Sequence, residues 1–146
     1  MRYLSNAFSM NMLPEGFSGG VMIEPLQACV ACSMAGRAEP AIGHETTARL
    51  VRTRLLDILE EGNAVAAPSE LERATEFNRA TIALSPGDEL IVAQYRGPRL
   101  PEGAMTLPEG AKFSFVWVLV AGGTKVASKS ASGWPQGAAE MRNRRP

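Results

Sequence analysis

The sequence predicts a single α/β domain, of the α+β kind, in which a mixed β-sheet is flanked by helices. Three observations predict this class. Short apolar runs typical of strands recur along the chain, one long amphipathic segment interrupts them, and 146 residues with 45% hydrophobic composition suit one domain with one core. We place the domain at residues 1–120 and interpret residues 121–146 as a Gly/Ser-rich tail with a basic end.

The first half of the chain contains two predicted strands and two predicted helices. Arg2–Ser5 is a short apolar start, and Gly20–Glu24 alternates apolar and polar residues. A short helix is predicted over Leu26–Ala35 and a longer one over Glu45–Glu61. The longer helix has apolar or small residues at helical spacing, namely Thr47, Val51, Leu55, Ile58 and Leu59. It should pack one face on the sheet.

A loop and a hairpin are predicted next. Residues 63–72 are expected to form a loop around Pro68, although Ser69-Glu-Leu-Glu resembles a helix start and would add one turn. Phe77–Leu84 and Glu89–Tyr95 are predicted strands. The turn chemistry of Ser85-Pro-Gly-Asp between them indicates a hairpin.

The last part of the domain is predicted to be a loop followed by a strand. Arg96–Lys112 holds three prolines and three glycines, which favours a shaped loop. Phe113–Val120 is a continuous apolar run and is expected to be a buried strand.

Charge and composition exclude several classes of protein. Fifteen basic and fifteen acidic side chains cancel, so no bulk field favours binding to duplex nucleic acid, and any polyanion site must be local. No apolar stretch approaches the roughly 20 residues that a membrane span needs. We therefore expect a soluble, cytoplasmic protein without a membrane partner.

The two cysteines do not suggest a cofactor site. Cys29 and Cys32 form a single C-x-x-C, which is too little for a disulfide framework. We interpret them as reduced, small core residues on the first helix. A zinc site shared with His44 is the less favoured alternative.

His44 is the only histidine, and it stands with Gly43 directly before the strongest helix. Unpaired backbone N–H groups at a helix start attract phosphate. The helix dipole disfavours imidazolium whereas a bound phosphate favours it, which suits a proton donor. The alternative is a capping or partly buried structural histidine.

Two further polar segments are candidates for binding. Asn6, Ser9 and Asn11 follow the first strand and are able to hydrogen-bond sugar or phosphate oxygens; alternatively they only organise the turn.

The second segment runs from Gln94 through Arg96 and Arg99 to Glu102. Arginine holds phosphate through paired N–H donors, and Glu102 would orient an arginine or a ribose hydroxyl. Alternatively these are solvated surface charges. No nucleotide-binding glycine motif, metal-protease helix or tight carboxylate cluster occurs, so we expect no cofactor and metal-free catalysis.

Three segments, in this order, resemble the viral ring nucleases, anti-CRISPR proteins of archaeal viruses and phages with bacterial relatives. They are Leu4-Ser-Asn-Ala-Phe-Ser-Met-Asn-Met-Leu, Ala41-Ile-Gly-His-Glu-x-Thr and Arg99-Leu-Pro-Glu-Gly. The first two are quite specific and the third is weaker. With the last strand, the resemblance extends from Leu4 to about Val120.

The resemblance implies a homodimer that encloses cyclic tetraadenylate, the second messenger of type III CRISPR defence, and cleaves it to linear diadenylates. His44 would be the general acid, Asn6, Ser9 and Asn11 would line the ring's backbone, and Arg99 and Glu102 would be the family's arginine and glutamate pair. The chain departs from the archaeal-virus pattern at Tyr95-Arg-Gly-Pro, so Arg96 is the alternative family arginine.

Two other classes of function remain open. A binding module would hold a cyclic nucleotide or nucleic acid and leave it intact, using the same asparagines and arginines. A structural virion or regulatory protein would work through the tail after Val120. A proton donor at His44 is needed only by the nuclease.

Overall fold

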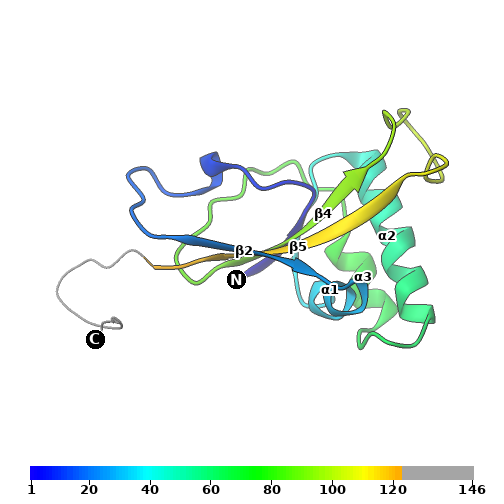
Figure 1. Ribbon diagram of the computed structural model, residues 1–146, viewed down its shortest axis with the longest axis horizontal. Helices are drawn as coiled ribbons and strands as arrows, with labels where there is room; N and C mark the ends of the chain where they lie inside the picture. Colours follow the sequence, from blue (N-terminus) through cyan, green and yellow to red (C-terminus); the bar gives the residue numbers. More distant parts are fainter. Residues whose placement is uncertain (123–146) are drawn as a thin grey trace.

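A five-stranded mixed sheet forms the centre of the fold in this computed structural model, which describes residues 1–122 (Figure 1). The strands are β1 (Arg2–Ser5), β2 (Val21–Leu26), β3 (Glu39–Ala41), β4 (Glu89–Arg96) and β5 (Lys112–Val120). Their order is β2-β5-β4-β1-β3. β1 runs parallel to β3 and β4, whereas β5 is antiparallel to β2 and β4. The predicted tail lies almost wholly outside the described residues.

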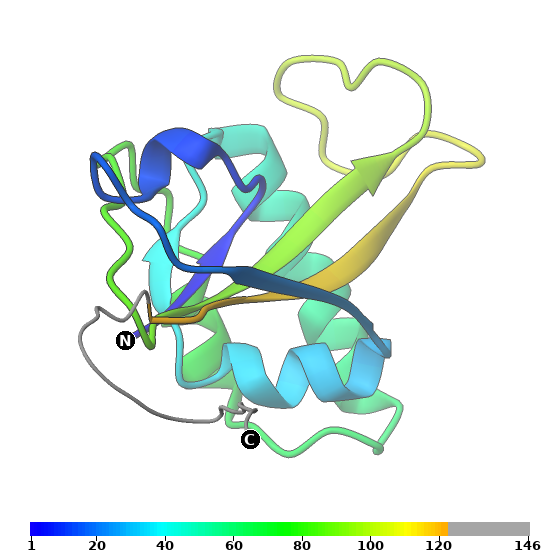
Figure 2. The same cartoon turned by 60° about the vertical axis from the view of Figure 1, so that its left-hand side comes forward.

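Three helices cover one face of the sheet (Figure 2). They are α1 (Ala28–Ala35), α2 (Glu45–Glu60) and α3 (Pro68–Ala74). α2 buries Leu50, Val51, Leu55 and Ile58 on one side, which confirms the predicted amphipathic helix. The predicted fold class, a mixed sheet flanked by helices, is therefore confirmed.

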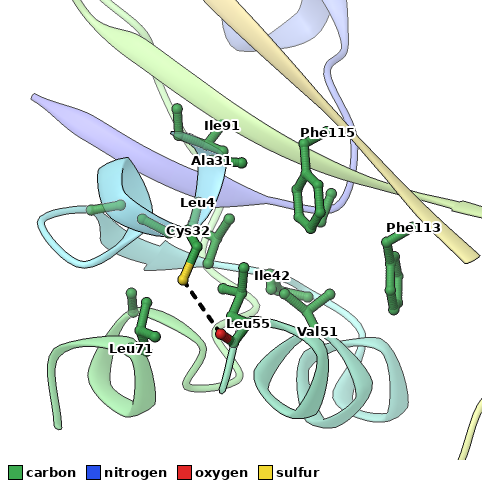
Figure 3. Close-up of a cluster of buried hydrophobic side chains, with 14 of the residues drawn as sticks. Leu4, Ala31, Cys32, Ile42, Val51, Leu55, Leu71, Ile91, Phe113 and Phe115 are labelled. Atoms are coloured by element: carbon green, nitrogen blue, oxygen red, sulfur yellow. Dashed lines mark hydrogen bonds between the residues drawn. The ribbon is translucent and has the colours of Figure 1, made fainter. Parts of the chain in front are cut away.

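The core lies between the helices and the sheet (Figure 3). Leu4 from β1 and Ile91 from β4 are fully buried in it, and burial of each such side chain contributes about 1.5–3 kcal/mol. Cys32 is also fully buried, and its Sγ donates a hydrogen bond to the carbonyl oxygen of Leu55 at 3.3 Å. Burial raises the pKa of this thiol, and Cys29 adds to the effect. Both thiols are free; Cys32 belongs to the core, as expected, and Cys29 is partly buried against it.

The opposite face of the sheet is covered by loops instead of helices. Leu90, Val92 and Val118 are buried there under side chains from the segments that follow β1 and precede β4. The first of these segments contains a short 3-10 helix, η1 (Met10–Met12), which was not predicted from the sequence. Both segments also reach the edge of the sheet that carries the candidate site.

The predicted hairpin of Phe77–Leu84 with Glu89–Tyr95 is wrong. β4 already has a neighbour on each side, β1 and β5, so no edge remains for a third partner. Phe77–Leu84 is irregular apart from one isolated bridge between Phe77 and Ile42. The Ser85-Pro-Gly-Asp turn does form, since the Asp88 carboxylate accepts from the backbone N–H of Ser85 at 2.8 Å.

Two elements were missed or misplaced. β3 has only three residues and contains Pro40, so it depends on β1 for its pairing and leaves no periodic pattern. Residues 63–72 were predicted to be a loop, with a helix start at Ser69-Glu-Leu-Glu as the alternative; α3 begins at Pro68 and confirms the alternative. The proline occupies the first helical turn, and the Glu70 side chain accepts from the Ala67 N–H at 3.0 Å, as a capping residue does.

Candidate functional site

The candidate site lies where the parallel strands end. β1, β3 and β4 run in the same direction, so their carboxyl ends point towards one edge of the sheet. Asn6 directly follows β1, Gly43 and His44 follow β3, and Arg96 ends β4. In open sheets with parallel strands this edge is where ligands commonly bind.

Three adjoining hollows follow this edge. The central hollow, about 360 Å³, is lined by Asn6, Ser9, Asn11, Gly43 and Arg79 among others. The histidine hollow, about 320 Å³, is lined by Gly43, His44, Glu45, Thr46, Arg49, Arg79, Glu102 and Gly103. The outer hollow, about 430 Å³, is lined by Asn6, Gln94, Tyr95 and Arg96. Gly43 and Arg79 are shared by the first two hollows and Asn6 by the first and third, so all three form one surface.

His44 is the N-cap residue of α2. Its Nδ1 accepts a hydrogen bond from the backbone N–H of Thr47 at 3.2 Å and lies 2.7 Å from the Thr47 Oγ1. The residue is exposed, and its other ring nitrogen is not used by these contacts. The capping role predicted as the alternative for His44 is therefore present, and it leaves Nε2 available to a ligand.

The loop between β4 and β5, residues 97–111, is attached to the first turns of α2. The Gly103 N–H donates to the Thr46 Oγ1 at 3.0 Å, and the Arg49 guanidinium donates to the carbonyl oxygen of Ala104 at 3.3 Å. Thr46 is buried. These two bonds bring Glu102 to the hollow that contains His44.

The polar segment after β1 has two roles. The Asn6 Oδ1 accepts from the Gly43 N–H at 3.3 Å and so links the end of β1 to the start of α2. The Ser9 Oγ accepts from the Asn11 N–H at 3.2 Å and caps η1, as predicted for a residue that organises a turn. Asn6, Ser9 and Asn11 all line the central hollow.

Asn78 and Arg79 were missed as site residues because their segment was predicted to be a strand. The backbone N–H of Asn78 donates to the carbonyl oxygen of Ile42 at 3.0 Å, and its Nδ2 donates to that of Pro40 at 2.9 Å. This fixes the segment beside the residues that precede His44. A signal was present, since asparagine is depleted in strands and enriched in turns.

Arg79 is the cation that joins two parts of the site. It lines both the central and the histidine hollow, and its guanidinium carbon lies 5.4 Å from the ring centroid of Phe77. Such stacking orders an exposed arginine while leaving its N–H donors free for an anion.

The two arginines of the β4–β5 segment lie in different places. Arg96 and Gln94 line the outer hollow with Asn6. Arg99 is exposed on the loop and lines none of the three hollows. Within residues 1–122, no group of three histidine, cysteine, aspartate or glutamate side chains is arranged to hold a metal ion, and no helix is long and apolar enough to cross a membrane.

The described residues thus form a single α+β domain with polar hollows at the ends of its parallel strands. The chain belongs to the STIV B116-like family, whose model matches residues 2–111 and thus every residue of the three hollows. The structure is similar to that of B116 of Sulfolobus turreted icosahedral virus, with 28% identity and a TM-score of 0.56 over 81% of this chain and 97% of the viral one. No curated protein matches the chain. The predicted resemblance to a family of virus proteins is therefore confirmed.

Proposed function

We propose that the chain is a metal-independent ring nuclease, which binds cyclic tetraadenylate between two copies and cleaves it to linear diadenylates. The observation that carries the proposal is His44 at the start of α2, in a hollow that also contains Arg49, Arg79 and Glu102. A phosphate there would meet backbone N–H groups, guanidinium groups and an imidazole within one small space.

The chemistry needs no added nucleophile. A ribose 2′-oxygen attacks its own adjacent phosphorus, the bond from phosphorus to the 5′-oxygen breaks, and a 2′,3′-cyclic phosphate forms. The protein has to hold an in-line geometry, which contributes several kcal/mol in comparable reactions. His44 in its imidazolium form gives a proton to the departing 5′-oxygen, and the 2′-hydroxyl proton passes to solvent.

The other residues hold the substrate in this geometry. Arg79 and the amides at the start of α2 offset the charge that develops on the phosphorane. Glu102 orients a ribose hydroxyl or an arginine. Asn6, Asn11, Gln94 and Arg96 line the neighbouring hollows, where the remaining nucleotides of the ring would lie. A homodimer places two such surfaces against a ligand that is itself twofold symmetric.

One observation favours a second candidate, a protein that binds the ring and leaves it intact. The Nδ1 of His44 caps α2, so the residue has a structural use that requires no catalysis. In this alternative the same hollows hold the ligand, and the resulting complex would remove the messenger by sequestration.

The test is incubation of the purified full-length protein with cyclic oligoadenylates of different ring size in EDTA, with products resolved by chromatography and mass spectrometry. We expect linear diadenylates that end in 2′,3′-cyclic phosphate or its opened form. A ring methylated at each 2′-oxygen is the matched control, because it should bind and stay intact. Binding without cleavage of the unmodified ring would favour sequestration, and light scattering with and without ligand would test the dimer.

A further inference from the structure

We propose that Thr47 is a positioning residue, whose hydroxyl allows His44 to gain and lose a proton without leaving the start of α2. This inference rests on the proposed function, in which His44 is the general acid. It is carried by a pair of contacts: the Nδ1 of His44 lies 2.7 Å from the Thr47 Oγ1 and 3.2 Å from the Thr47 backbone nitrogen.

The two contacts suit different protonation states of the ring. Neutral imidazole with its proton on Nε2 presents a lone pair at Nδ1, which accepts the backbone N–H of Thr47. Imidazolium carries a proton on Nδ1, so this backbone contact would bring two donors together. The Thr47 hydroxyl has both a proton and lone pairs, so it is able to accept from the protonated Nδ1 at the shorter of the two distances.

The position of Thr47 makes its hydroxyl available for this task. The residue is buried at the third helical position of α2, and within residues 1–122 its Oγ1 has no hydrogen-bonding partner except His44. The neighbouring Thr46 hydroxyl is already bonded to Gly103. Without this hydroxyl, protonation of Nδ1 would remove the acceptor that caps α2, and the ring would turn away from the hollow.

Other charges also act on the ring, and they are unchanged in the variants proposed below. Glu45 and Arg49 come from α2, Arg79 comes from the segment before β4, and Glu102 comes from the 97–111 loop. A difference among variants that retain these four side chains therefore reports on the hydroxyl alone.

The test compares three variants on the same helix. Thr47→Val removes the hydroxyl at nearly constant volume, Thr47→Ser restores it, and Thr53→Val is the control, because Thr53 is exposed and its hydroxyl bonds only the Arg49 carbonyl among the described residues. We expect Thr47→Val to lower cleavage about 10- to 100-fold near neutral pH, as for one lost hydrogen bond to a charged group. The loss should shrink at lower pH, binding should be unchanged, and Thr47→Ser should recover most of the rate.

A second readout does not depend on cleavage. His44 is the only histidine in the chain, so once any purification tag is removed its ring gives a single set of NMR signals. Thr47→Val should shift the ring's titration towards lower pH, whereas Thr47→Ser and Thr53→Val should leave it as in the wild type. An unchanged titration in Thr47→Val, or a rate loss that is equal at every pH, would overturn the inference. Absence of cleavage by the wild type would instead overturn the proposed nuclease, while the titration still decides the role of Thr47.

Discussion

Replacement of His44 by asparagine separates its two roles, because asparagine is a preferred N-cap residue and has no proton to deliver at neutral pH. In the wild type the Nδ1 of His44 accepts the Thr47 N–H at 3.2 Å. The Oδ1 of asparagine is able to accept the same N–H, so His44→Asn should keep α2 capped. Alanine has no acceptor, so His44→Ala should lower the free energy of unfolding by about 1 kcal/mol.

These differences are large enough to measure. For a domain of this size, a loss of about 1 kcal/mol corresponds to a fall of about 4 °C in Tm. We therefore expect His44→Ala to melt about 4 °C below the wild type and His44→Asn to melt within about 1 °C of it. Loss of a general acid costs ~10²- to 10⁴-fold in rate, so both variants should cleave the ring at least about 100-fold more slowly.

The assay is single-turnover cleavage of cyclic tetraadenylate, accompanied by calorimetric binding and thermal unfolding. Ligand affinity should change far less than the rate, because the α2 amides and Arg79 remain in place. Near wild-type cleavage by His44→Asn would refute the reasoning, since it would show that His44 acts only as a cap.

Three further predictions concern the metal, the arginines and the core. Full cleavage activity should persist in EDTA because the ribose hydroxyl is the nucleophile, and loss on chelation with recovery on adding a divalent ion would contradict this. Arg96→Ala should slow cleavage more than Arg99→Ala in parallel assays, because Arg96 lines the outer hollow whereas Arg99 lines none of the three hollows; the opposite order would make Arg99, which the family motif favours, the arginine that acts on the ring. Leu55→Ala should lower the free energy of unfolding by about 2–5 kcal/mol in urea titrations, because the side chain is fully buried, and a loss below about 1 kcal/mol would contradict this packing.

The elements that the sequence predicted well carry their signal locally. α2 has an apolar face at helical spacing, and β4 and β5 are apolar runs long enough to stand out. β3 could not be predicted in this way, since three residues around Pro40 become a strand only beside β1, which is distant in sequence. The false hairpin has the same origin: its turn forms locally, but the neighbour that β4 takes on that side is β1.

The residues of the candidate site differ in the same way: some have a local signal in the sequence and others depend on distant contacts. His44 was predicted because a helix start can be read from the adjacent sequence, and its capping bond to Thr47 is equally local. Arg79 was not predicted, because it reaches the site only after Asn78 has bonded to the carbonyl oxygens of Ile42 and Pro40. When contacts between distant segments position a residue, no periodic pattern in its own segment predicts that position.

The site's charge also depends on this assembly. The chain has no formal net charge, so long-range attraction of a polyanion is weak and binding must come from short-range contacts. Arg49 and Arg79 come from different segments, yet both line the histidine hollow. Arg49 also holds the 97–111 loop through the carbonyl oxygen of Ala104, so the residue that adds positive charge also helps to bring Glu102 to the same hollow. The contact of Arg49 with Ala104 thus helps to bring one of the positive charges and the acidic side chain of Glu102 into the same hollow.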